Sequence, residues 1–299
     1  MRECGSRLRG GEEGQLVGVA IRGTISRIVS PGFSAAEFGR TMTAMSAWVA
    51  GGAGNCAYCH NTANFAADSN KGQPIYTKLV ARMMLRMTRR VNADYAQHVG
   101  GTGVTCYTCH RGQPLPNGLW FYTDQNQILR HYLDRDDIRV QSHTIEPLPG
   151  EAANRTAIRQ TYNTYALMVT QSKALGVNCT YCHNSRAWTN WEESTPKRVV
   201  ALYGAAMLRD INMNYLNPLQ PVYPRSRLGE HGDAPKAQCV TCHNGVYKPM
   251  YGAKMVKDYP ALWGARVGTP RQDRWMPQAN RCTTAHHSWR RCPHRPVPN

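Results

Sequence analysis

The sequence has no long apolar run and little of the pattern that marks β-structure. No stretch of 18 apolar residues occurs in the 299-residue chain, so no conventional membrane-spanning helix is expected. Phenylalanine is scarce, with 4 residues against 15 tyrosines, and the alternation of apolar and polar residues that predicts strands is weak. The 18 proline and 26 glycine residues indicate much irregular backbone.

Acidic residues are also few, with 19 Asp and Glu against 36 Lys and Arg, which gives a net charge of +17. Nucleic-acid binding is a common cause of such an excess. No dense basic cluster accompanies a recognition motif here, so we expect no nucleic-acid partner. The charge predicts solubility and a weak attraction to acidic surfaces.

Cysteine, in contrast, is plentiful, and eight of the 11 cysteines form four Cys-x-x-Cys pairs that are each followed by histidine. The motifs are Cys56-Ala-Tyr-Cys59-His60, Cys106-Tyr-Thr-Cys109-His110, Cys179-Thr-Tyr-Cys182-His183 and Cys239-Val-Thr-Cys242-His243. Two thiols at this spacing can bond to the two vinyl groups of one haem, and the adjacent histidine can bind its iron. The sequence therefore predicts four covalently bound haem c groups.

Three other uses of paired cysteines fit less well. A disulfide or redox pair has no need of a following histidine. A zinc ribbon brings two pairs within roughly 15–20 residues of each other, whereas Cys56 and Cys106, or Cys179 and Cys239, are much farther apart. Iron–sulfur proteins use other cysteine spacings.

One helix is predicted before each motif, and most of the helix starts carry a recognisable signal. A capping box of Ser34 and Glu37, a proline at a first helical position and a closing Gly176 are such signals. The helices are predicted from Ser34 to about Val49, from Pro74 to about Tyr95, from Thr156 to Gly176, and from Ser194 to about Leu216.

The predicted fold is mainly α with long irregular loops, in two pseudo-repeated dihaem halves whose haems form the core. The boundaries are an atypical N-terminal segment 1–33, a first half 34–116, a connector 117–155 with one short helix expected over Leu129–Asp137, a second half 156–264, and an unrelated basic tail 265–299. Residues 1–25 and 265–299 are predicted to be poorly ordered, since they lack apolar periodicity.

A pure electron carrier also fills the sixth position on iron, commonly with Met or His. Candidates occur on or after each predicted helix, although methionines at helical spacing are often simply core residues. They are Met42 and Met45; Met83, Met84, Met87 and His98; Met168; and Met207 and Met213. The residues alone do not choose among them.

From about Ser34 to Leu262 the chain resembles the tetrahaem cytochrome subunit of purple-bacterial photosynthetic reaction centres. The matching strings are Glu37-Phe-Gly-Arg-Thr-Met42-Thr-Ala, Gln97-His98-Val, Gly103-Val-Thr-Cys-Tyr-Thr-Cys-His-Arg-Gly112, Tyr165-Ala-Leu-Met168, Asn212-Met-Asn-Tyr-Leu216 and Cys242-His-Asn-Gly-Val-Tyr-Lys-Pro249. One departure is a segment between Met42 and Cys56 that is one residue longer than usual.

The resemblance implies the iron ligands: Met42 with His60, Met84 with His110, Met168 with His183, and His98 with His243. Met207 and Met213 then become core residues. It also implies a non-enzymatic electron relay from cytochrome c2 or a high-potential iron–sulfur protein to the photo-oxidised bacteriochlorophyll pair. The partners implied are the reaction-centre L and M subunits, and the place is the periplasmic side of the photosynthetic membrane, with which the protein associates.

The first residues carry no apolar region after Met1, so no signal peptide is visible, and we expect the natural N-terminus to be missing or replaced. Two functional alternatives remain open. One is a multihaem reductase that binds a small substrate at an open iron, and the other is a multihaem respiratory cytochrome, such as one that oxidises quinol at a membrane.

Overall fold

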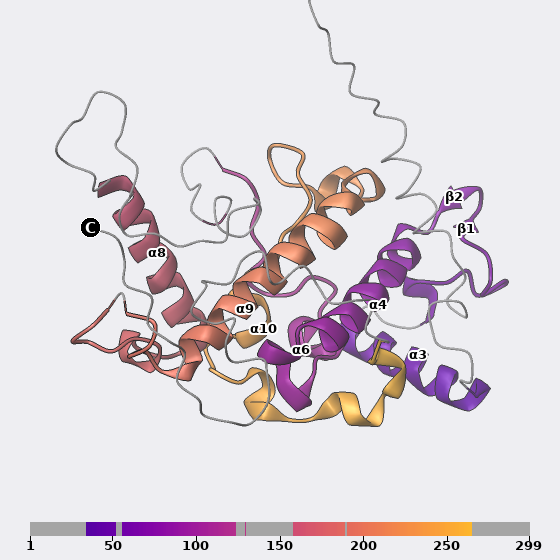
Figure 1. Ribbon diagram of the computed structural model, residues 1–299. Helices are drawn as coiled ribbons and strands as arrows, with labels where there is room; N and C mark the ends of the chain where they lie inside the picture. Colours follow the sequence, from indigo (N-terminus) through magenta and orange to yellow (C-terminus); the bar gives the residue numbers. More distant parts are fainter. Residues whose placement is uncertain (1–33, 52–55, 124–128, 130–157, 189, 265–299) are drawn as a thin grey trace, which may run out of the picture.

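The computed structural model describes residues 34–51, 56–123, 129, 158–188 and 190–264. These residues are mostly helical, with long loops and a single two-stranded hairpin, so the predicted mainly α class is confirmed. The helices are α3 (Ala35–Ala50), α4 (Tyr76–Asp94), α5 (Ala96–Val99), α6 (Cys106–His110), α8 (Ile158–Leu175), α9 (Pro196–Ile211) and α10 (Cys239–His243). In the view of Figure 1, α3 and α8 lie at opposite sides, with α4 and α9 between them.

Helix α3 begins as the capping box predicts. The Glu37 backbone N–H donates to Ser34 Oγ at 3.2 Å, and the Ser34 backbone N–H donates to Glu37 Oε2 at 3.0 Å. Together these bonds satisfy two donors that the first helical turn would otherwise leave without partners.

The prediction that Pro74 opens the next helix is wrong. Pro74 lies in the hairpin of β1 (Ser69–Asn70) and β2 (Gln73–Pro74), where it faces Ser69, and α4 begins at Tyr76. Positive φ angles at Lys71 and Gly72 form the two-residue turn of this hairpin. The fixed φ of proline suits a strand end as well as a first helical turn. The hairpin turn at Lys71 and Gly72 places Pro74 in the strand.

Gly176 ends α8 as predicted, in the left-handed conformation with φ +65°. A Cβ atom at this position would lie 2.0 Å from the Gly245 carbonyl oxygen, so the close approach of the segment after α10 (Cys239–His243) also requires glycine. The predicted start at Thr156 lies outside the described residues.

Helix α9 has Thr195 as its N-cap and Pro196 at its first position, as predicted. The chain then continues through a π-helical turn, η4 (Asn212–Leu216), which agrees with the predicted end near Leu216. Asn212 in this turn is buried, and its side chain bonds both the N–H and the carbonyl of Ala237, at 2.8 Å and 3.0 Å. The turn thereby fixes the segment that leads into α10.

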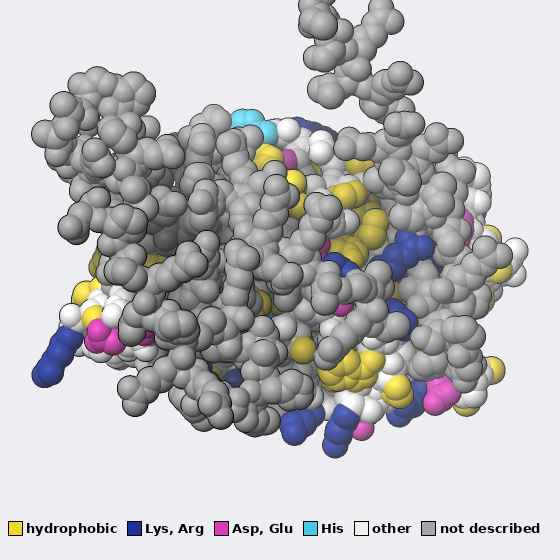
Figure 2. All heavy atoms as spheres, viewed as in Figure 1, with side chains coloured by type: hydrophobic (Ala, Val, Ile, Leu, Met, Phe, Trp, Pro, Cys, Tyr) yellow, Lys and Arg dark blue, Asp and Glu magenta, His cyan; other side chains and the backbone are white. Residues whose placement is uncertain are grey.

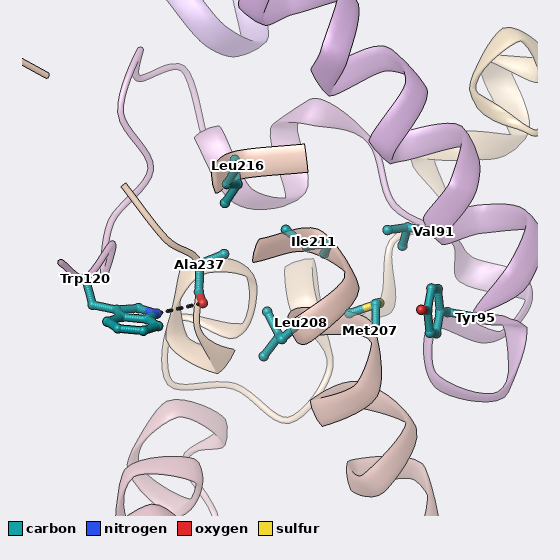
Figure 3. Packing of buried hydrophobic residues seen from close by; sticks show 8 residues of the cluster. All are labelled: Val91, Tyr95, Trp120, Met207, Leu208, Ile211, Leu216 and Ala237. Carbon is teal, nitrogen blue, oxygen red and sulfur yellow. Dashed lines mark hydrogen bonds between the residues drawn. The ribbon is translucent and has the colours of Figure 1, made fainter. Parts of the chain in front are cut away.

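The largest apolar cluster packs α4, α9 and the segment around Ala237, just before α10, against one another (Figure 3). Its members are Val91, Tyr95, Trp120, Met207, Leu208, Ile211, Leu216 and Ala237. The Trp120 indole N–H donates to the Ala237 carbonyl at 2.9 Å, which satisfies its one donor within the cluster. A second cluster, around Met45, Trp48 and Leu85, packs α3 against α4.

A buried ion pair anchors the chain just before α10. Lys236 is 0 % exposed, and its ammonium donates to Asp233 Oδ2 at 2.7 Å and to the Ala234 carbonyl at 2.9 Å. The same ammonium lies 3.7 Å from the centre of the Tyr122 ring, and the Tyr122 N–H donates to Asp233. Charge, hydrogen bonds and the aromatic face thus compensate the desolvation of this lysine.

Several predictions fall on residues that the structure leaves undescribed: most of the helix predicted over Leu129–Asp137, and the predictions for the two ends, 1–25 and 265–299. In the described part of the chain, no helix is both long and apolar enough to cross a bilayer. On the face shown in Figure 2, Lys and Arg side chains appear at several separate places among the described residues.

Candidate functional site

A cavity of about 1450 Å³ runs between the long helices. This volume exceeds the roughly 300–1,000 Å³ of a typical site for one small ligand. Ten of the twelve residues that define the four motifs line it, namely Cys59, Cys106, Cys109, His110, Cys179, Cys182, His183, Cys239, Cys242 and His243. Among the motif residues, Cys56 and His60 are the two outside its lining.

The four motifs adopt two backbone shapes. The first and third begin as 3₁₀ turns, η1 (Cys56–Tyr58) and η3 (Cys179–Tyr181). The second and fourth are the short helices α6 and α10, each of which has a side-chain capping box and ends in a left-handed residue, Arg111 or Asn244. The shapes therefore alternate along the chain.

In each motif histidine, the Nδ1 atom forms a hydrogen bond with a backbone carbonyl a few residues further along the chain. The acceptors are the carbonyls of Phe65 for His60 at 3.0 Å, Gln113 for His110 at 2.9 Å, Trp188 for His183 at 2.9 Å and Val246 for His243 at 3.0 Å. Because a carbonyl oxygen can only accept, Nδ1 carries the proton in all four rings. In the neutral form of each ring the lone pair is then on Nε2, and in this form a histidine binds a metal.

His98, on α5, is held in the same way from α9. Its Nδ1 donates to the Val200 carbonyl at 2.9 Å. The ring lies against that of His243, with the two centroids 5.9 Å apart and the planes at 67°. Burial lowers the pKa of both rings, to about 4 for His243, so both are neutral at pH 7. The structure thus brings together two residues that are far apart in the sequence.

The methionines predicted as candidate iron ligands have different surroundings in the structure. Five of the candidate methionines line the cavity, namely Met45, Met84, Met87, Met168 and Met207. Met42 does not, and is partly buried against the cluster around Met45 and Trp48. Met207 is a core residue, as expected. The same expectation is wrong for Met213, which is 39 % exposed because the π-helical turn directs it outward.

The predicted thioethers differ from the structure at one pair of residues. Cys109 and Cys242 form a disulfide, while the other six motif cysteines are free. The cause is the close packing of α6 against α10, which brings the two Cα atoms to 4.3 Å. A sulfur bonded to a second sulfur cannot bond a haem vinyl carbon, so the disulfide and the two thioethers are mutually exclusive.

Sequence reasoning missed the residues that hold these rings. Any residue type supplies a carbonyl, so Phe65, Gln113, Trp188, Val246 and Val200 carry no signal of their own. Their offsets do form a pattern, since the carbonyl follows the histidine by five residues in the first and third motifs and by three in the others.

Gly204 was also missed, although a glycine inside a predicted helix is a visible signal. It lies on α9 beneath the His98 ring, and a Cβ atom there would be 2.5 Å from Cε1, 2.8 Å from Nδ1 and 3.1 Å from Nε2. Real Cβ contacts are essentially never so short, so the ring occupies space that only glycine leaves open.

The sequence model of the photosynthetic reaction centre cytochrome c subunit matches residues 26–131 and 123–263. Subunits of that name from Rubrivivax gelatinosus and Thermochromatium tepidum are each 42 % identical, over 257 and 260 residues. These matches cover 77 % and 78 % of this chain and 68 % and 62 % of the relatives. The subunit from Roseobacter denitrificans is 37 % identical over 258 residues, 76 % of this chain and 68 % of the relative. The chain belongs to the family of photosynthetic reaction centre cytochrome c subunits.

Proposed function

We propose that this chain binds four covalent haem c groups and passes electrons from a soluble donor to the photo-oxidised bacteriochlorophyll pair of a reaction centre. The observation that carries the proposal is the common state of the four motif histidines, each with its Nδ1 proton held by a backbone carbonyl. Four separate loops that all fix one tautomer are most simply explained by four metal ligands.

The residues present fit such a cofactor. Six of the eight motif cysteines are free thiols, and the cavity is larger than one small ligand requires. Covalently bound haem also follows from membership of a cytochrome c family. The number four rests on the four motifs. For the second and fourth of them, an external thiol must first reduce the Cys109–Cys242 disulfide to two thiols, being oxidised to a disulfide itself.

For the iron ligands we propose the pairs Met42 with His60, Met84 with His110, Met168 with His183, and His98 with His243. The last pair has the most direct support, because the two neutral rings already lie 5.9 Å apart. Met168 is supported by its place in the cavity lining as the one methionine of α8. Met84 shares that lining with Met87, so its choice rests on the family resemblance. Met42 rests on its position in α3 and on the family resemblance.

We also propose that residues 34–116 and 156–264 are duplicated dihaem halves joined by the connector. In each half a 3₁₀ motif is followed by a helical motif, and the first long helix packs on the helical motif, α3 on α6 and α8 on α10. A threonine at the start of the second long helix donates to the loop of the 3₁₀ motif, from Thr77 to the Tyr58 carbonyl and from Thr195 to the Tyr181 carbonyl.

Haem supplies reversible one-electron chemistry, and the protein sets how readily each site accepts the electron. Methionine as sixth ligand raises the potential, so the three His/Met sites are expected to lie above the His/His site. No substrate bond is made or broken, so no catalytic residue is needed. The proposed partners are the L and M subunits and a donor, either cytochrome c2 or a high-potential iron–sulfur protein, on the periplasmic side of the membrane.

A carbon monoxide titration separates this function from the reductase alternative. With every sixth position filled by Met or His, the reduced native protein should show no carbon monoxide spectrum, because no iron offers an open site. The positive control is His98→Ala, which should bind carbon monoxide at one haem. Rapid binding by the native protein would instead favour an enzyme with an open iron.

A further inference from the structure

We propose that Lys78 raises the reduction potential of the haem at the first motif, acting through the Phe65 carbonyl that holds the His60 ring. The inference rests on the proposed function, because it takes His60 as an iron ligand. Lys78 is thus a positioning and tuning residue that would touch neither the haem nor its iron.

Lys78 is a buried cation whose ammonium group is surrounded by carbonyls of the loop that follows the first motif. It lies on the first turn of α4 and is 3 % exposed. Its ammonium donates to the carbonyls of Phe65, Ala66 and Ala67, at 2.9, 3.0 and 2.6 Å. Three donors therefore meet three consecutive acceptors, which fixes the charge in one place.

The Phe65 oxygen accepts from two donors, Lys78 Nζ and His60 Nδ1. A hydrogen bond from Nδ1 to a carbonyl makes the imidazole a more basic ligand, which favours the oxidised metal. An oxygen that already carries an ammonium has less electron density to offer the ring, so His60 becomes less basic. The nearby positive charge also favours arrival of an electron. Both effects raise the potential.

The charged side chains next to Lys78 do not cancel its positive charge. Asp68 lies 3.3 Å from the Lys78 ammonium and accepts from Arg82 at 2.7 Å. The hydrogen bond from Arg82 lowers the pKa of Asp68, so its carboxylate is ionised at pH 7. The Asp68 carboxylate thus faces two cationic side chains, those of Lys78 and Arg82. The net charge of these three groups is positive.

The third motif supplies a natural comparison. It shares the 3₁₀ turn, the five-residue offset and an aromatic side chain beside the histidine, His60 with Phe65 and His183 with Trp188. Lys78 follows Thr77 as Pro196 follows Thr195. A buried cation at the first motif therefore corresponds to an uncharged ring at the third. At the third motif Arg198 donates to the Asn190 carbonyl at 2.9 Å, whereas Lys78 donates to the same carbonyl that holds the motif histidine.

The test is an equilibrium redox titration of the haem-loaded protein. Lys78→Met keeps the length of the side chain and removes its charge. The potential of one haem should fall by about 59 mV, which is a tenfold change in a one-electron equilibrium constant, while the other three stay in place. Lys78→Arg should restore most of the shift. Lys173→Met, at an exposed position on α8, is the matched control and should leave all four potentials unchanged.

A second variant covers the case in which Lys78→Met does not fold. Asp68→Asn keeps the shape and removes the negative charge, so the same haem should move upward. No shift in either variant, or shifts no larger than that of Lys173→Met, would overturn the inference. The His60→Met variant assigns the potentials, because the haem whose spectrum changes in it is the haem at the first motif. If His60→Met changes no haem, the proposed ligation itself fails, which is a distinct outcome.

Discussion

Replacing His98 by methionine is expected to raise the reduction potential of one haem, on the order of 100 mV, and to leave the other three nearly unchanged. The His98 ring meets His243 and the α9 backbone, so the change should stay at the fourth motif. Exchange of an imidazole for a thioether removes electron donation to the iron and favours the reduced state. Redox titration with low-temperature electron paramagnetic resonance, which distinguishes His/His from His/Met haems, measures both effects.

Met213→Leu is the control for this experiment. Met213 lies on the π-helical turn after α9 and is exposed, so its loss should alter no potential. If Met213→Leu or Met207→Leu shifted the haem of the fourth motif while His98→Met did not, that haem would be a His/Met site and the proposed cross-over ligand would be wrong.

Gly204→Ala is expected to open the same iron without replacing either of its two ligand residues. The added methyl group would lie 2.5–3.1 Å from three atoms of the His98 ring, which must move away from α9 and lose its hydrogen bond to Val200. One haem in four should then bind carbon monoxide in the reduced protein, as a carbon monoxide difference spectrum would show.

Gly39→Ala is the matched control, because Gly39 lies inside α3 and has no atom within 4 Å of a built Cβ. Both substitutions improve helix propensity by about 1 kcal/mol, and only the one at Gly204 meets a ring. A Gly204→Ala protein that still excluded carbon monoxide would show that the His98 ring is not seated against α9 in the haem-loaded state.

Local signals in the sequence predicted local structure well. The Ser34–Glu37 box and Gly176 mark helix ends through bonds and angles within a few residues, and the structure has both. Pro74 misled because proline suits two conformations, and the hairpin turn at Lys71 and Gly72 decides between them. The cysteine spacing predicted a haem c protein, in agreement with the cytochrome c family, because covalent haem attachment constrains adjacent residues.

Contacts across the chain were not predictable from local patterns. α5, which carries His98, packs on α9, and α10, which carries His243, packs on α6 and α8. The two rings meet through this packing, and no spacing rule spans that separation. Their pairing came from the family resemblance. The backbone carbonyls that orient the histidines, and the approach of Cys109 to Cys242, depend on how loops and short helices pack, which residue types alone do not encode.

The most direct test of the central claim is the intact mass of the mature protein from the periplasmic fraction. We expect an added mass equal to four haems, with all eight motif cysteines resistant to alkylation and mapped to haem-bearing peptides. A native mass without haem, with these thiols free to alkylate, or a peptide pair joined by Cys109 and Cys242, would contradict the account.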